Sequence, residues 1–264
     1  MHILRFDSLE STNKYCERLD LRQVEAFTVV WAREQHGGVG QRGNRWHSAP
    51  GENLTFSIVM HPQGIEAARQ YGLTMQCATA IARWLEQRLA DDGRSNPTGA
   101  TSFNKGCSGK VSIKWPNDIY VGDRKICGTL ITCTLKGGMV EDAVCGIGLN
   151  VNETDFPEEL PNAVSLAQLT GRRYDLEPLL RSLCEAIEAE RAEGVEERYL
   201  ERLYQRGVDA HYLYKGTPIV ATIEGINSYG HLLLTTSGGE AISCQLKELV
   251  FCQPRTETAS QRMM

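Results

Sequence analysis

The stretch VSIKWPNDIYVGDRKICGTLITCTL, residues 111–135, decides the predicted fold. Its short runs of β-branched and aromatic residues are separated by Pro116-Asn117-Asp118 and by Gly122-Asp123, a pattern typical of strands joined by tight turns. Gly137-Gly138 forms a similar break before another apolar run. The sequence therefore predicts an antiparallel meander over residues 111–151.

Helical periodicity is found on both sides of this meander. Apolar side chains recur at spacings of four and three between Tyr71 and Leu89, which indicates one buried helical face. Ser11 and Asp175 are candidate N-caps, and Pro178 suits a first helical turn. We expect helices at residues 11–19, 66–90 and 175–203, strands at 28–33 and 53–60, and an exposed loop at 91–110.

The character of the sequence changes after about residue 212. The short apolar runs PIVATI, HLLLTT and AISC are separated by turn sequences rich in Gly, Asn and Ser, which predicts a small β-barrel. The fold class is thus predicted to be α+β: a mixed, mostly antiparallel sheet with helices, then a small all-β module. We place one large domain at residues 1–207, the β module at 208–252 and a flexible tail at 253–264.

Composition excludes several classes of protein. The 264 residues carry a net charge of −5, which argues against a nucleic-acid partner. No run of 18 apolar residues and no export signal is present, so we expect neither a membrane partner nor secretion. The nine cysteines form no C-x-x-C pair and the six histidines lack metal-site spacing. A cytoplasmic protein without disulfides or a zinc site is therefore predicted.

The stretch GVGQRGNRW, residues 38–46, suits an anionic ligand. Its glycines allow close approach to backbone amides, and Arg42 and Arg45 present the planar fork that matches phosphate. Trp46 offers a face on which a base can stack. The alternative is a glycine hairpin with solvated arginines and a core tryptophan. The stretch is neither a P-loop nor a Rossmann fingerprint.

Two further segments carry candidate residues. In KWPNDIYVGDRKICGTLI, residues 114–131, Asp118 is expected to hold a cation or a lysine, and Lys125 and Gly128 are expected to face opposite ways because they lie three apart on a strand. In GIGLNVN, residues 146–152, the two glycines suggest close approach of another group. The alternatives are an ordinary hairpin with a solvated lysine, and a strand whose two asparagines face solvent.

Five segments in this order, STN (11–13), EQ with GVGQRGNRW (34–46), KWPND (114–118), KICGTLI (125–131) and GIGLNVN (146–152), resemble the biotin–protein ligase family. The resemblance covers nearly the whole chain. It implies a class II synthetase-like catalytic domain at residues 1–207 and an SH3-like β module at 208–252. It also implies that Mg-ATP converts biotin into biotinyl-5'-adenylate, which a lysine of a biotin carboxyl carrier protein domain then attacks.

The resemblance gives each candidate residue a role. Lys125 is the implied catalytic residue, because its charge offsets the negative charge that develops on the α-phosphate. The residues implied to bind biotin are Ser11, Thr12, Asn13, Gln35, Gly38, Gly40, Gln41, Lys125 and Gly128. Those implied to bind ATP or the adenylate are Arg42, Arg45, Trp46, Lys114, Asn117, Asp118 and Asn150. Mg²⁺ enters with ATP, with Asp118 as a candidate contact, and no protein-only metal site is expected.

One position departs from the family pattern. Val39 stands where the glycine loop of the family typically has an arginine, and a valine side chain cannot contact phosphate. The loop at residues 36–48 is expected to be mobile without ligand. Because the STN segment begins at residue 11, we expect a short form of the enzyme without a DNA-binding domain in front of it, and no DNA partner.

Three alternatives remain open at this point. A lipoate–protein ligase or octanoyl transferase relative would use a similar domain for a different acid. A catalytically impaired biotin-binding relative would follow if Val39 has removed the chemistry. Exposed strands at residues 140–151 are expected to be able to pair edge to edge with a carrier domain or with a second copy in a homodimer.

Overall fold

The computed structural model describes residues 1–94 and 109–252, without the side chains of Arg42 and Arg94. The chain divides into two compact units, Met1–Tyr204 and Gln205–Met264. The predicted loop at 91–110 lies mostly outside the described residues, as does the whole of the predicted tail at 253–264. The division after Tyr204 falls three residues before the boundary predicted from the sequence.

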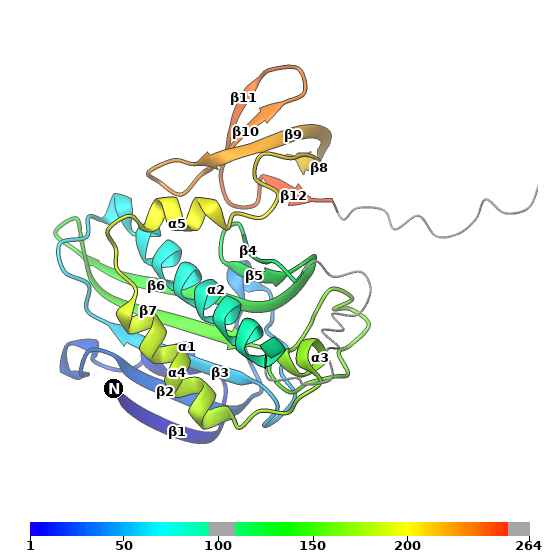
Figure 1. The fold of residues 1–264 in the computed structure, drawn as a ribbon. Coiled ribbons are helices and arrows are strands. Elements are labelled where there is room, and N and C mark those ends of the chain that lie inside the picture. Colours follow the sequence, from blue (N-terminus) through cyan, green and yellow to red (C-terminus); the bar gives the residue numbers. More distant parts are fainter. Residues whose placement is uncertain (95–108, 253–264) are drawn as a thin grey trace, which may run out of the picture. The chain divides into compact units, whose positions relative to one another are not determined.

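The first unit contains one seven-stranded sheet in the order β1-β2-β3-β7-β6-β5-β4 (Figure 1). Neighbouring strands are antiparallel, except that β1 and β2 are parallel. The predicted meander is confirmed, with tight turns between β5 and β6 and between β6 and β7. The strands are β1 (His2–Leu9), β2 (Thr28–Gln35), β3 (Leu54–Met60), β4 (Val111–Lys114), β5 (Asp118–Val121), β6 (Arg124–Lys136) and β7 (Met139–Leu149).

The expectation that residues 140–151 offer a free strand edge is wrong. Strand β7 is hydrogen-bonded to β3 on one side and to β6 on the other. The backbone donors and acceptors of residues 143–149 are therefore used on both sides within the sheet, and no partner strand can pair with them.

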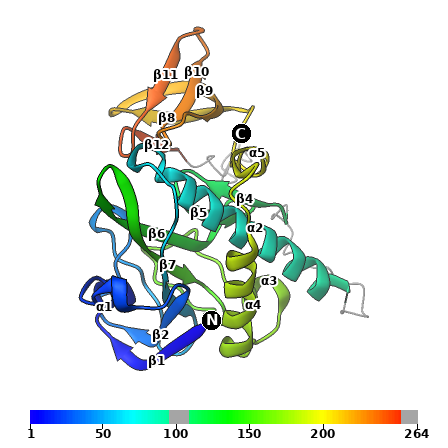
Figure 2. The same cartoon turned by 90° about the vertical axis from the view of Figure 1, so that its left-hand side faces the viewer.

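Helices cover both faces of this sheet (Figure 2). On one face lies α1 (Thr12–Glu17), whose Cys16 packs in a cluster with Val144 of β7. On the other face lies α2 (Tyr71–Arg94), whose Cys77 has its sulfur 3.5 Å from that of Cys145, the next residue of β7. Because adjacent strand residues point to opposite faces, Val144 and Cys145 show that α1 and α2 lie on opposite sides.

Two helical predictions need correction. The helix expected at residues 175–203 is two helices, α4 (Leu176–Ala189) and α5 (Val195–Glu201), because Glu190 leaves the helical conformation and Gly194 has a positive φ. Asp175 caps α4 as predicted, since its side chain accepts from the Glu177 amide. Helix α2 starts five residues later than expected and continues through Asp91–Arg94, which were expected to be loop. The 3-10 turns are η1 (Leu21–Gln23), η2 (Gln41–Gly43) and η3 (Ala67–Arg69).

Among the α-helices and strands of the first unit, β1 and α3 (Leu166–Thr170) were not predicted. Strand β1 is an edge strand with mostly exposed or half-exposed residues, so its sequence lacks the apolar run that marks an interior strand. Helix α3 has only five residues, too few to show a period. Its start carries a capping box, in which the Ser165 hydroxyl and the Gln168 side chain each accept from the other residue's backbone amide.

The second unit is a five-stranded antiparallel sheet in the order β11-β10-β9-β8-β12. Its predicted apolar runs fall in β9, β10 and β11, and side chains such as Tyr212, Ile223 and Leu234 are buried. The strands are β8 (Asp209–Tyr214), β9 (Thr217–Ile226), β10 (Leu232–Thr236), β11 (Ala241–Cys244) and β12 (Leu249–Phe251). Among the described helices of both units, none is long and apolar enough to cross a membrane.

Candidate functional site

The start of α1 is fixed to the sheet by hydrogen bonds. Thr12 and Asn13 are buried, and the Ser57 hydroxyl of β3 lies 2.7 Å from the Thr12 Oγ1 and 2.5 Å from the Asn13 Oδ1. The Asn13 Nδ2 donates to the carbonyl of Leu130 on β6. Ser11 occupies the N-cap position without a capping hydrogen bond from its side chain. The predicted STN segment is thus brought to the face of the sheet that α1 covers.

Gly146 makes room for the Asn13 side chain. A Cβ at position 146 would lie 2.0 Å from the Asn13 Oδ1, far inside contact distance. Position 146 is also paired with Ser57 in the sheet register, so Asn13 sits directly over this residue pair. The first glycine of GIGLNVN therefore has a specific cause, which is the close approach of the STN segment.

Gln35, at the end of β2, extends this polar group. Its Oε1 accepts from the Thr12 backbone amide at 2.7 Å. Its Nε2 lies 3.5 Å from the point where a Cβ of Gly38 would be. The side-chain amide of Gln35 therefore links the start of α1 to the start of the glycine loop.

The glycine loop is a small hairpin. The Gly40 amide donates to the Asn44 carbonyl at 2.7 Å, and the Trp46 amide donates to the Gly38 carbonyl at 3.1 Å. Val39 and Arg45 face each other across this hairpin, and both are exposed. The predicted phosphate contact of Arg42 concerns a side chain outside the described part of the structure, while Gln41 begins the 3-10 turn η2.

The indole of Trp46 lies on two glycines. A Cβ at Gly148 would be 2.2 Å from the Trp46 Cε2, and one at Gly128 would be 3.2 Å from its Cζ3. These glycines are direct partners on β6 and β7, so together they form a flat floor for the ring. The indole N–H is buried and has no hydrogen-bond partner among the described residues.

A β-bulge corrects the prediction that Lys125 and Gly128 face opposite ways. Tyr120 pairs with Lys125 but Ile119 pairs with Cys127, so one residue of β6 has no partner on β5. A Cβ at Gly128 would therefore lie 3.4 Å from the Lys125 Cε. The extra residue reverses the alternation and brings the lysine to the glycine floor.

Lys125 forms an ion pair beside the indole. Its Nζ is 2.7 Å from the Asp118 Oδ1 and 5.6 Å from the centre of the Trp46 ring. Two roles were predicted for Asp118, contact with a cation or with a lysine. This ion pair shows it in contact with a lysine. Among the described residues, no group of three His, Cys, Asp or Glu side chains is arranged to hold a metal ion.

Lys114 lies next to this pair. Its Nζ donates to the Tyr120 hydroxyl at 3.2 Å and lies 4.9 Å from the centre of that ring. Burial lowers the pKa of Lys114, Lys125 lowers it further by repulsion, and Asp118 opposes the shift. Two lysines therefore share one carboxylate, which leaves net positive charge at this end of the site.

Two of the residues predicted to contact the nucleotide, Asn117 and Asn150, each bind a backbone carbonyl. The Asn117 side-chain amide donates to the Thr129 carbonyl, and that of Asn150 donates to the Val164 carbonyl. Asn150 and Asn152 are both buried, so the alternative in which the two asparagines of GIGLNVN face solvent is wrong. Asn117 and Asn150 each tie a site segment to its neighbour: Asn117 fixes the turn that carries Asp118.

Glu153 is a buried carboxylate that the sequence did not single out. It accepts from the Ala49 amide at 3.1 Å, from the Asn53 side-chain amide and from the His47 ring, whose Nε2 is 2.8 Å away. Because Ala49 and His47 follow Trp46 directly, Glu153 anchors the end of the glycine loop. The one sequence signal that could have drawn attention to Glu153 was its position three residues after Asn150, a predicted site residue.

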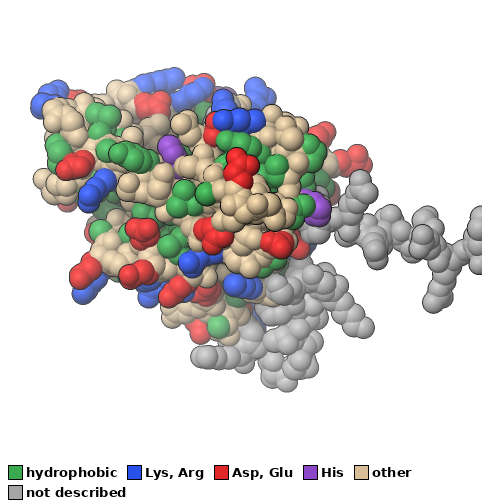
Figure 3. Space-filling model, turned by 90° about the horizontal axis from the view of Figure 1, so that it is seen from above, with side chains coloured by type: hydrophobic (Ala, Val, Ile, Leu, Met, Phe, Trp, Pro, Cys, Tyr) green, Lys and Arg blue, Asp and Glu red, His purple; other side chains and the backbone are tan. Residues whose placement is uncertain are grey.

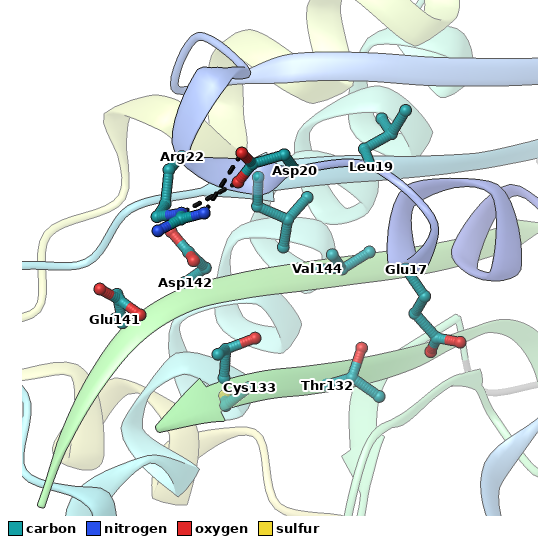
Figure 4. Close-up of a pocket in the computed structure, with 11 residues that line it drawn as sticks. Glu17, Leu19, Asp20, Arg22, Thr132, Cys133, Glu141, Asp142 and Val144 are labelled. Atoms are coloured by element: carbon teal, nitrogen blue, oxygen red, sulfur yellow. Dashed lines mark hydrogen bonds and ion pairs between the residues drawn. The ribbon is translucent and has the colours of Figure 1, made fainter. Parts of the chain in front are cut away.

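A separate pocket of about 310 Å³ opens beyond the end of α1 (Figure 4). Acidic side chains are prominent in its lining, and Asp20 is paired with Arg22 there. None of the residues predicted from the sequence lines it. We therefore locate the candidate site at the contacts described above and not in this pocket.

The site has two chemically different ends. Thr12, Asn13 and Gln35 form a neutral group of donors and acceptors, whereas Lys114 and Lys125 form a cationic group, and Trp46 reaches the latter. Such an arrangement suits a substrate with a neutral polar head and an acidic group that meets a phosphate.

Comparison with solved structures defines the fold. The chain superimposes on the biotin protein ligase of Aquifex aeolicus in complex with biotin and ATP with a TM-score of 0.72 and 22% identity, covering 96% of this chain and 99% of that one. At this identity the likeness shows that the fold is that of a biotin protein ligase.

Comparison of sequences shows the family. The model of the biotin/lipoate A/B protein ligase family matches residues 5–150, and the chain belongs to this family. It is 30% identical over 177 residues to the bifunctional ligase/repressor BirA of Bacillus subtilis, covering 66% of this chain and 49% of that protein. It is 27% identical over 226 residues to the biotin--[acetyl-CoA-carboxylase] ligase of Paracoccus denitrificans, covering 81% and 86%. The chain thus spans about half the length of the Bacillus relative.

Proposed function

We propose that this chain is an ATP-dependent biotin–protein ligase that acts through biotinyl-5'-adenylate. The observation that carries the proposal is the neutral group at Thr12 and Gln35 on the same sheet face as the Lys125–Asp118 pair. The relatives named for biotin ligation and the family match support the same substrate.

The first step forms the adenylate. A biotin carboxylate oxygen attacks the α-phosphorus of ATP, the bond to the β-phosphate bridging oxygen breaks, and pyrophosphate leaves. Negative charge increases on the α-phosphate oxygens, and the Lys125 ammonium is placed to offset it. Asp118 holds that ammonium in position at 2.7 Å and keeps it from extending into solvent.

The second step transfers the acyl group. The neutral amine of a carrier lysine attacks the acyl carbon of the mixed anhydride, AMP leaves with the bonding electrons, and the amide nitrogen loses its proton. The acceptor is proposed to be a biotin carboxyl carrier protein domain. The chain has only to align the two reactants and exclude water from the adenylate, which accounts for a site built from positioning contacts.

Phosphate binding is proposed for the glycine loop and the lysines. Exposed Arg45 and the loop amide of Gln41 suit the phosphates, and Lys114 adds charge beside Lys125. Mg²⁺ is proposed to enter with ATP and to neutralise phosphate charge. Trp46 is proposed as the platform on which adenine stacks, because its indole lies beside Lys125, where the phosphates are proposed to bind.

The polar group discriminates against lipoate. The cyclic urea of biotin carries N–H and C=O groups that match acceptors and donors at Thr12 and Gln35, whereas a dithiolane ring carries neither. A lipoyl ring would leave these polar groups without partners, which costs more than a missing apolar contact.

Within the described part of the site, a direct acyl transferase mechanism has no suitable thiol. Cys127 lies next to Gly128 but is fully buried, and burial raises the pKa of its thiol. A thiol that stays protonated is a poor nucleophile. Chemistry through ATP is therefore favoured over an enzyme-bound thioester.

The proposed setting follows from the same features. We assign catalysis to residues 1–207, propose that the SH3-like module at 208–252 assists it, and propose a reducing cytoplasm as the compartment.

On the face drawn in Figure 3, Lys and Arg side chains are scattered among Asp and Glu, which with the net charge of −5 supports the proposal of no DNA partner. A homodimer, like the docking of a carrier domain, would have to use a surface other than the β7 edge.

Labelling of a carrier domain tests the proposal. The full chain, Mg-ATP and a purified apo-carrier domain are incubated with labelled biotin, with an excess of unlabelled biotin or lipoate as competitor. We expect ATP-dependent labelling that biotin suppresses and lipoate does not. Transfer of lipoate would establish the lipoyl relative, and biotin binding without transfer would establish the impaired relative.

A further inference from the structure

Ser57 is a fully buried polar residue in a mostly apolar strand. It lies in β3, LTFSIVM, and its relative exposure is 0%. Its hydroxyl is in contact with the first two residues of α1, at 2.7 Å from the Thr12 Oγ1 and 2.5 Å from the Asn13 Oδ1. It does not belong to the set of residues assigned to biotin or ATP.

The single proton of Ser57 can serve only one of these contacts. The Asn13 Nδ2 donates to the Leu130 carbonyl, so it is the Asn13 Oδ1 that faces Ser57, and an amide oxygen can only accept. If Ser57 donated elsewhere, two oxygen lone pairs would meet at 2.5 Å in a buried place, which is strongly unfavourable. The Ser57 proton therefore goes to Asn13.

This assignment fixes the proton of Thr12. The contact between the Ser57 and Thr12 hydroxyl oxygens at 2.7 Å needs one proton between them, and Thr12 supplies it. The two lone pairs of the Thr12 hydroxyl oxygen can then only accept. Nearby, the Gln35 Oε1 is occupied by the Thr12 amide, which leaves the Gln35 Nε2 as a donor.

We propose that Ser57 is a positioning residue that fixes Thr12 as a hydrogen-bond acceptor, so that the site recognises an N–H group next to a carbonyl in the substrate ring. The inference rests on the proposed function and deepens it, because the cyclic urea of biotin offers that pair of groups. Ser57 acts through Thr12 and Asn13 and does not itself touch the substrate.

Calorimetric binding of biotin to the full chain tests this inference. We compare wild type, Ser57→Ala, Thr12→Val and the double variant. Each single change is expected to weaken biotin binding about tenfold, the usual effect of one lost hydrogen bond at a polar site. Because Ser57 acts through Thr12, the double variant is expected to bind about as weakly as a single one, and not a hundredfold more weakly.

The control removes a buried hydroxyl elsewhere. Thr79 is fully buried in α2, and its hydroxyl has no partner among the described residues, so Thr79→Val is expected to leave biotin affinity unchanged. Ser57→Cys, with a weaker donor of similar size, is expected to bind with intermediate affinity and serves if the alanine variant does not fold. The KM for ATP is expected to stay at the wild-type value in all Ser57 variants.

Three results would overturn the inference: unchanged biotin affinity in Ser57→Ala, multiplicative losses in the double variant, or an equal rise in the KM for ATP. If wild type itself does not bind biotin, the proposed function fails instead. The two failures are therefore distinguishable in one set of titrations.

Discussion

The two ends of the site are built differently. At the start of α1, Thr12 and Asn13 are buried and held by short hydrogen bonds to Ser57 and Leu130, with no charge involved. At the other end, Lys125 and Asp118 form an ion pair whose side chains remain about a quarter to a third exposed. The first end suits recognition by shape and hydrogen bonding, and the second suits charge that changes during a reaction.

Of the changes considered, Lys125→Ala is expected to give the largest difference between the two ends, because it should slow adenylate formation far more than it weakens biotin binding. Without the ammonium, the growing charge on the α-phosphate lacks its partner, so adenylate formation is expected to fall about 100- to 1000-fold. Biotin affinity without ATP should change far less. Single-turnover adenylate formation and biotin titration measure the two effects.

The matched control is Lys136→Ala, because Lys136 lies on the same strand in an exposed ion pair with Glu141. It is expected to retain wild-type rates. Adenylate formation at the wild-type rate in Lys125→Ala would mean that another group offsets the phosphate charge.

Gly148→Ala is expected to damage the charged end. The added Cβ would lie 2.2 Å from the Trp46 ring, so the indole must leave the glycine floor beside Lys125. A displaced ring misaligns the reactants, and kcat/KM is expected to fall about a hundredfold. Stopped-flow or steady-state labelling of the carrier domain measures this loss.

Gly72→Ala provides the comparison for Gly148→Ala. A Cβ at Gly72 in α2 meets nothing within 4 Å, so this variant should be fully active and slightly more stable. If Gly148→Ala matched it in activity, the placement of Trp46 on Gly148 would not matter for catalysis.

These contacts show what could be predicted from the sequence. The order of motifs located the STN segment, the glycine loop and Lys125, and the glycine pair in GIGLNVN indicated close approach. The groups that come close are Asn13 at Gly146 and Trp46 at Gly148. Both lie more than 90 residues away in the sequence, so the local sequence could not identify them. A serine inside the mostly apolar run of β3 was the signal for Ser57.

The bulge in β6 shows why other features of the site could not be predicted from the sequence. Strand alternation placed Lys125 and Gly128 on opposite faces, and the residue left unpaired between them reverses this. Which residue of a strand is left out depends on the register with β5, which the sequence does not reveal. The backbone partners of Asn117 and Asn150 were likewise not predicted, because a buried backbone partner cannot be recognised from sequence.

The charged end should respond to pH in a defined direction. The pKa of Lys114 is lowered, chiefly by burial, so on raising the pH this lysine loses its charge before an ordinary lysine would. ATP binding is therefore expected to weaken as the pH rises through that lowered pKa. Lys114→Arg keeps the charge and should move the alkaline limb of the kcat/KM profile for ATP to higher pH.

The neutral end provides the internal control for this titration. Biotin affinity is measured over the same pH range in wild type and in Lys114→Arg. The two pH profiles are expected to coincide. If Lys114→Arg shifted the pH profiles for ATP and for biotin by the same amount, the pH effect would come from folding and not from phosphate binding.

Val39→Arg is expected to have the smallest effect. Val39 is exposed on the hairpin opposite Arg45, so an arginine there can extend toward phosphate without disturbing the core. We expect retention of the adenylate to improve a few-fold, as for one added exposed charge contact. Release of biotinyl-5'-adenylate in the absence of a carrier measures it, and an unchanged release rate would show that this position acts through its backbone.

The most direct test of the account is exchange of labelled pyrophosphate into ATP by the wild-type chain, with biotin, with lipoate and with neither. The two-ended site predicts exchange that requires biotin and does not occur with lipoate or with ATP alone. Exchange supported by lipoate, or no exchange although biotin binds, would contradict the assignment of this chain as a biotin-activating ligase.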